Sequence, residues 1–146
     1  MTPLVTISVP AVRSVDYAAL ASAIEAIESR PGRAIGTHGE VGPFQFKPET
    51  WTRFTEMPIW CALDRQKAAV VAERALRHYA AELQARGIEP TIYRLALCWK
   101  CGDNAVLLHR YLGKEEKDYA VRVENLYTDR LKHAPALSPQ PSTISP

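Results

Sequence analysis

Apolar side chains recur along most of the chain at steps of three and four residues, the period of an amphipathic helix. Residues 16–28 show this pattern first, and the sequence Arg30-Pro31-Gly32 ends it, because proline restricts the residue before it and glycine permits a left-handed turn. The apolar positions of this predicted helix are Tyr17, Leu20, Ala21, Ile24 and Ile27.

Residues 64–86 form the longest periodic stretch, and Gly87 stands where a C-terminal glycine cap belongs. Its predicted buried stripe is Ala68, Val71, Ala72, Ala75, Leu76, Tyr79 and Leu83. Shorter helices are predicted over residues 47–55, with Pro48 at the first helical position, and over residues 90–101, 104–112 and 117–131.

Residues 33–46 lack this period and instead carry Gly36, Gly39 and Gly42 at three-residue intervals. Such spacing predicts an irregular loop whose backbone approaches another group closely. We expect any strand content to be confined to this glycine loop. The predicted organisation is an extended lead-in over residues 1–14, one mainly helical domain over residues 15–132, and a disordered tail rich in proline and serine over residues 133–146.

Composition narrows the class of protein. A chain of 146 residues has room for one domain with a modest core. The 18 basic and 16 acidic side chains give a net charge of +2, which argues against a nucleic-acid-binding face. No apolar run approaches the ~20 residues that cross a membrane. The N-terminus lacks the basic region of a signal peptide, so export by another route and release by lysis both remain open.

Three cysteines exclude a complete disulfide framework. Cys98 and Cys101 have the spacing of a metal or redox pair, and a zinc- or redox-linked helical regulator is one hypothesis. A second such pair is absent, so we favour two small buried thiols on a helix, with no metal and no cofactor.

Four separated segments carry the candidate chemistry. They are Glu28-Ser29 at a helix end, Gly42-Pro43-Phe44-Gln45, Ala96-Leu97-Cys98-Trp99-Lys100-Cys101-Gly102, and Asp118-Tyr119 with Val123 following. This ordered set resembles the lytic transglycosylase (SLT) domain, a branch of the lysozyme-like superfamily that includes goose-type lysozymes. That family has a helix-ending "ES", a "GLMQ"-type turn, an "AYNAG"-type helix and a late tyrosine, and the resemblance spans about residues 16–130.

The resemblance implies a mainly α fold of the lysozyme-like α+β superfamily, in which the glycine loop forms the substrate cleft. It also implies cleavage of peptidoglycan between N-acetylmuramic acid and N-acetylglucosamine, with Glu28 as the single acid and base and a 1,6-anhydro product. The residues expected to bind or orient substrate are Ser29, Gly42, Phe44, Gln45, Trp99, Lys100 and Tyr119.

Elementary chemistry points to the same glutamate. The acid must stay protonated near neutral pH, whereas an ordinary glutamate has a pKa of about 4.3. An apolar cleft raises that pKa by desolvation, and the C-terminal end of a helix also disfavours a negative charge. We expect Phe44, Trp99 and Tyr119 to supply the apolar wall. Glu25, one turn earlier, is a weaker candidate acid.

Two residues depart from the family pattern, since Trp99 replaces its tyrosine and Lys100 its asparagine. A cation beside Glu28 would lower the pKa of the acid, so either Lys100 points outward toward a substrate carboxylate or activity is reduced. A cell-wall-binding domain with a weakened site therefore remains an alternative.

A lysozyme-like hydrolase, such as a phage endolysin, is the other alternative. Glu40 is the only acid of the glycine loop and could orient a water molecule, but we favour a solvated loop side chain there. The expected partner is the peptidoglycan glycan strand, met by a monomer in the periplasm, in the cell wall or outside the cell, with no nucleic acid and no membrane span.

Overall fold

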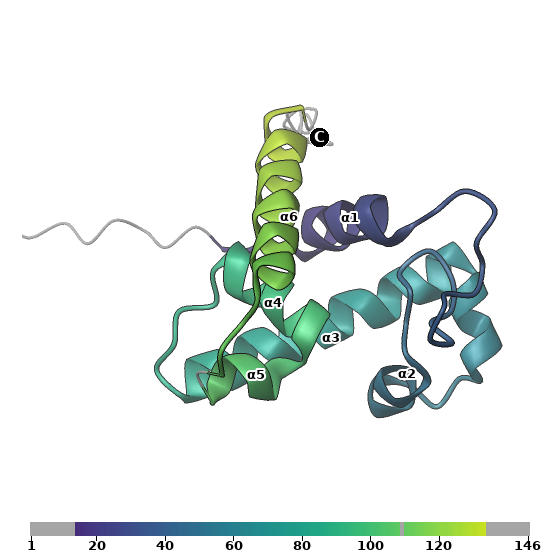
Figure 1. The fold of residues 1–146 in the computed structure, drawn as a ribbon, viewed down its shortest axis with the longest axis horizontal. Helices are drawn as coiled ribbons and strands as arrows, with labels where there is room; N and C mark the ends of the chain where they lie inside the picture. The colour runs from purple at the N-terminus through teal and green to yellow at the C-terminus, as the bar shows by residue number, and fades with distance from the viewer. Residues whose placement is uncertain (1–13, 109, 134–146) are drawn as a thin grey trace, which may run out of the picture.

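The computed structural model describes residues 14–108 and 110–133. Within these ranges the chain folds into α-helices joined by loops and one 3-10 helix, η1, without a β-strand (Figure 1). The elements are α1 (Tyr17–Glu28), α2 (Pro48–Phe54), η1 (Ile59–Leu63), α3 (Arg65–Ala85), α4 (Ile92–Cys101), α5 (Asp103–Leu107) and α6 (Lys114–His133). The prediction of a mainly helical single domain is confirmed.

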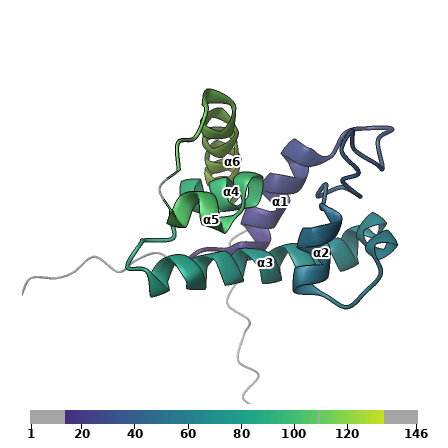
Figure 2. The same cartoon turned by 60° about the horizontal axis from the view of Figure 1, so that its bottom comes forward.

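The long helix α3 runs below α1, α4, α5 and α6 in the view of Figure 2. Helix α6 packs against α1 and α4, while α1 and α4 also contact α3. At the other end of α3, α2 and η1 pack on the same helix. The glycine loop, which connects α1 to α2, lies at this second end (Figure 2).

Local sequence explains most helix ends. Asp16 and Asp64 cap α1 and α3 by accepting hydrogen bonds from backbone N–H groups of the first turn. Helix α3 ends at Ala85, and Gly87 two residues later forms the predicted glycine cap, with a φ of 70°. There the Ile88 N–H donates to the Leu83 carbonyl, as in a Schellman motif.

Two predictions of element bounds were wrong. The helix expected over residues 104–112 ends at Leu107, and the last helix begins at Lys114 instead of residue 117. The connection between α2 and α3 contains η1, which no period in the sequence indicates. Residues 1–13 and 134–146, which make up nearly all of the predicted lead-in and tail, lie outside the described residues.

The predicted stripe of α3 is buried at every position, so it forms the base of the core. A cluster of aromatic rings extends this core toward the glycine loop. Phe46 of the loop meets Trp51 of α2 and Trp99 of α4 edge to face, at centroid distances of 5.0 and 5.2 Å. Each such pair adds about 0.5–1.5 kcal/mol beyond area burial, so the cluster fixes the loop against α2 and α4.

In the part of the chain that the structure describes, no helix combines the length and the apolar character needed to cross a bilayer.

Candidate active site

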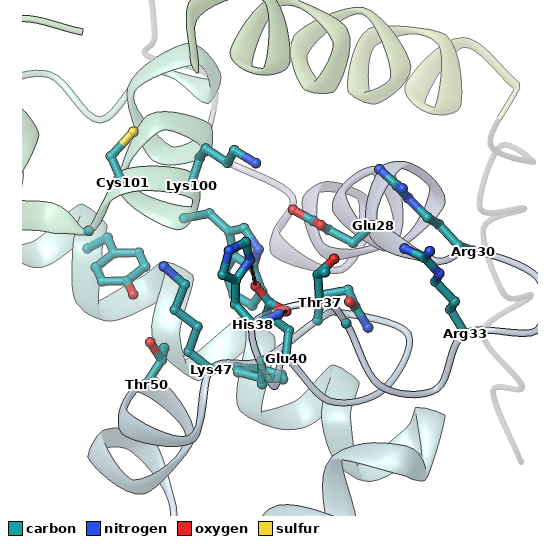
Figure 3. A pocket seen from close by; sticks show the side chains of 16 residues that line it. Glu28, Arg30, Arg33, Thr37, His38, Glu40, Lys47, Thr50, Lys100 and Cys101 are labelled. Atoms are coloured by element: carbon teal, nitrogen blue, oxygen red, sulfur yellow. Dashed lines mark hydrogen bonds and ion pairs between the residues drawn. The ribbon is translucent and has the colours of Figure 1, made fainter. Parts of the chain in front are cut away.

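Glu28 is the last residue of α1, at the point where the helix gives way to extended backbone. The Ser29 N–H donates to the Glu25 carbonyl at 2.8 Å and closes the last helical turn. The half-buried Glu28 side chain lines two pockets, of about 470 and 620 Å³. Arg30 and Lys100 also line both pockets, so the two hollows adjoin at Glu28. Figure 3 shows the first pocket, with the Glu28 carboxyl pointing into it.

The glycine loop forms the wall opposite Glu28. Val41 and Phe46 exchange two backbone hydrogen bonds, of 2.9 and 3.0 Å, which fold the loop back on itself. Gly42 has a φ of 79°, and a Cβ atom there would lie 2.7 Å from the carbonyl carbon of Ala62 in η1. Glycine is therefore required at this position for two reasons, the positive φ and the close approach to η1.

Gln45 is held in the left-handed region, with a φ of 52°, which is uncommon for a residue with a side chain. Its backbone N–H and its side-chain Nε2 both donate to the Gly42 carbonyl, at 3.0 and 2.7 Å. The side chain thus stabilises the turn. It also lines the first pocket, and no protein hydrogen bond is assigned to its carbonyl oxygen within the described ranges.

The pKa of Glu28 is raised above its ordinary value, and burial is the main cause. The Tyr119 hydroxyl and the positive charges of Lys100 and Arg30 each lower the pKa, whereas the negative charge of Glu40 raises it. Desolvation outweighs the three opposing contributions. The Glu28 carboxyl therefore holds its proton to a higher pH than an exposed glutamate does.

Tyr119 of α6 is 6% exposed, and its hydroxyl has no hydrogen-bond partner in the described structure. The hydroxyl lies near the Glu28 carboxyl and acts on its pKa without meeting the geometry of a hydrogen bond. An unpaired buried hydroxyl costs about 1–3 kcal/mol, so a group that offered it a partner would gain that energy.

Lys100 does not point away from the site. Its Nζ lies 5.3 Å from the centroid of the Tyr119 ring, in a cation–π arrangement, and its charge acts on Glu28. The expected opposition between this cation and the acid is therefore present, but burial of Glu28 exceeds it.

Glu40 lines the first pocket, and its side chain is 18% exposed. The carboxylate accepts the His38 N–H at 3.0 Å, and backbone hydrogen bonds lower its pKa. The first pocket thus contains one carboxyl group with a lowered pKa, Glu40, and one with a raised pKa, Glu28.

The remaining predicted residues separate into two groups. Trp99 lines the first pocket, together with Phe46 and Tyr79, which the sequence argument missed. Phe44 is 1% exposed and lines neither pocket at Glu28, so its expected place in the apolar wall belongs to Phe46. Ser29 and Gly42 also line neither of these pockets and act on the site through the backbone.

The weaker candidate acid, Glu25, is occupied elsewhere. Both of its carboxylate oxygens accept from the Arg65 Nε, at 2.8 and 2.9 Å. This contact with Arg65 holds the Glu25 side chain outside the pockets at Glu28, which leaves Glu28 as the candidate proton donor.

The cysteines have unreactive surroundings. Cys98 is fully buried, and burial raises the pKa of its thiol to about 12. Cys101 is half-buried, lines the first pocket, and also has a raised pKa. Among the described residues, no three His, Cys, Asp or Glu side chains come together in a geometry that could hold a metal ion.

Comparisons with known proteins give no independent assignment: no protein-family model, curated protein or solved structure matches this chain.

Proposed function

We propose that this protein is a lytic transglycosylase that cleaves the β-1,4 bond between N-acetylmuramic acid and N-acetylglucosamine in peptidoglycan, and that it belongs to the lysozyme-like superfamily. The observation that carries the proposal is the position of Glu28. A carboxyl group with a raised pKa lies at the junction of two pockets, so a glycan strand that occupies both passes over the acid. Its place of action is then the periplasm, the cell wall or the space outside the cell.

In the first step Glu28 donates its proton to the glycosidic oxygen. The bond between this oxygen and C1 of the muramic acid breaks, and the N-acetylglucosamine leaves with a new hydroxyl group. Positive charge develops on the muramyl ring while Glu28 becomes a carboxylate. The ionised Glu40 in the same pocket is suited to stabilise that charge.

In the second step the Glu28 carboxylate accepts the proton of the C6 hydroxyl of the same muramic acid. The C6 oxygen then bonds to C1 and closes the 1,6-anhydro ring. Glu28 is protonated again, so one carboxyl group serves both steps and no water is consumed. The Tyr119 hydroxyl, which has no partner, is suited to donate a hydrogen bond to Glu28 while it is ionised.

The pocket walls suit a sugar chain. Trp99 and Phe46 offer apolar ring surface, while Gln45 and Thr50 offer polar groups, which is the usual make-up of a small-molecule site. The Gln45 carbonyl oxygen can accept a hydrogen bond from a hydroxyl or acetamido group, because its amide nitrogen is held by Gly42.

A hydrolase is the second candidate, and Glu40 is the observation that favours it. An ionised carboxylate in the pocket of the acid is the arrangement in which a base activates water. The two reactions differ in their products, since hydrolysis leaves a reducing end and transglycosylation leaves a 1,6-anhydro end.

Mass spectrometry of digested, purified peptidoglycan tests both candidates. We expect 1,6-anhydro muropeptides from the wild type, and from Glu40→Gln at a reduced rate if Glu40 only stabilises charge. Glu28→Gln should give neither product while remaining folded. Reducing-end products that disappear in Glu40→Gln would establish the hydrolase instead. Binding without any product would leave a cell-wall-binding domain.

A further inference from the structure

The turn after α1 holds two arginines in a fixed relation. The Arg33 N–H donates to the Arg30 carbonyl at 3.1 Å, and the two residues form an isolated antiparallel β-bridge. Gly32 between them has a φ of 78°, which only glycine adopts readily. Side chains of directly opposed residues in an antiparallel pair project from the same face, so Arg30 and Arg33 extend to the same side.

Both arginines line the pocket that contains Glu28, and Figure 3 shows them next to that residue. Neither has an acidic side chain within ion-pair distance among the described residues, whereas Arg53, Arg65 and Lys114 do have such partners. Two uncompensated guanidinium groups at one end of a substrate pocket are an arrangement that recognises an anion. Guanidinium groups match carboxylates with paired hydrogen bonds.

The proposed substrate has one place for such an anion. N-acetylglucosamine is neutral, but the muramic acid bears a side arm that ends in a carboxylate, either its own lactyl group or the peptide attached to it. We infer that Arg30 and Arg33 form a clamp for a carboxylate on the muramic acid side arm, which selects acidic strands and sets the strand on Glu28. This inference rests on the proposed function.

The clamp is coupled to the acid. Four groups act on the Glu28 pKa: Tyr119 from α6, Lys100 from α4, Arg30 from the turn and Glu40 from the glycine loop. Of these, Arg30 is the cation that a bound carboxylate in the clamp would neutralise. Neutralisation removes a contribution that lowers the pKa, so substrate with an intact carboxylate helps Glu28 to keep its proton.

Three preparations of one glycan separate the possibilities. The first is intact peptide-bearing strands. In the second, carbodiimide and methylamine convert the peptide carboxylates to neutral methylamides. In the third, an amidase removes the peptides and exposes the lactyl carboxylates. Comparable preference for the first and third over the second would assign the clamp to any side-arm carboxylate, whereas preference for the first alone would assign it to the peptide.

The variant is Arg30→Gln with Arg33→Gln, and its charge-matched control is Arg86→Gln with Lys132→Gln, two exposed cations that line neither pocket at Glu28. We expect the wild type and the control to cleave intact strands with about ten-fold higher kcat/KM than methylamide strands, and the clamp variant to lose this preference. On intact strands, the pH at which activity declines should also be higher than on methylamide strands, in the wild type and the control but not in the clamp variant.

Equal cleavage of intact and methylamide strands by the wild type would overturn the clamp while leaving the proposed function in place. If the wild type cleaves nothing, the proposed function fails separately. In that case co-sedimentation of Glu28→Gln with the intact and methylamide strands still decides the clamp. Tighter binding of intact strands, lost when Arg30→Gln and Arg33→Gln are added, supports it, and equal binding refutes it.

Discussion

Gly42 allows the glycine loop to pack closely against η1, and the Gly42→Ala variant tests this packing. Gly39→Ala in the same loop serves as the control. Gly39 lies three residues earlier in the same loop with nearly the same φ, 81° against 79°. A Cβ atom at Gly39 meets nothing within 4 Å, whereas at Gly42 it meets the backbone of Ala62. The two substitutions therefore share a conformational cost, and only Gly42→Ala adds a steric one.

The magnitudes follow from these two contributions. A non-glycine residue in the left-handed region costs about 1–2 kcal/mol, which we expect for Gly39→Ala. Overpacking against backbone that cannot rotate away adds about 1–3 kcal/mol, so Gly42→Ala should lose about 2–5 kcal/mol. Because the Gly42 carbonyl holds Gln45 through two hydrogen bonds, Gly42→Ala should also reduce peptidoglycan cleavage more than Gly39→Ala does.

Urea unfolding measures the difference directly, because a change in midpoint at constant slope reports stability alone. We expect a lower midpoint for both variants and a clearly lower one for Gly42→Ala. Equal midpoints would refute the close approach of the loop to η1 and, with it, the positioning of Gln45.

Three further predictions concern charge. Lys100→Met should move the decline of kcat/KM to higher pH, because a cation that lowers the Glu28 pKa is removed, while Lys114→Met should not. Glu28→Gln should raise the free energy of unfolding at pH 7. Because the Glu28 pKa is higher in the folded chain than in the unfolded chain, the wild type loses stability as pH rises through the folded pKa. The gain from Glu28→Gln should therefore vanish at a pH below the unfolded pKa. Asp103→Asn should cost about 1.5–3 kcal/mol in urea unfolding at pH 7, because Asp103 accepts two hydrogen bonds from Arg53. Arg53 lowers the Asp103 pKa, so this loss should shrink as pH falls through it.

The sequence predicts the helices that bury a regular stripe and carry a local stop signal. Helix α3 is the clearest case, because its two signals depend only on residues that are close in the sequence. These signals are the seven buried stripe positions and the glycine cap at Gly87. The first turn of α6 was missed because Lys114, Glu115 and Glu116 show no apolar period. Two acidic residues at a helix N-terminus are favourable there, and this signal would have placed the start correctly.

The candidate site divides in the same way. Glu28 follows from its position at the end of a periodic helix, because the period locates the end. The positions of Glu40 and of Phe46, which lines the pocket in place of Phe44, do not follow from the sequence. A loop without a hydrophobic period gives no indication of which side chains face the pocket. Their places depend on the bridge between Val41 and Phe46 and on contacts with η1, both of which form only in the folded chain.

The proposed chemistry depends on the raised pKa that burial gives Glu28, and carboxyl NMR titration measures this pKa most directly. The Glu28→Gln spectrum identifies the signal, and the titration is run on the free protein. We predict a Glu28 pKa above that of glutamate in an unfolded peptide, and a further rise in Lys100→Met. A pKa at or below the peptide value would contradict the account, because Glu28 would then have lost its proton before it could donate it to the glycosidic oxygen.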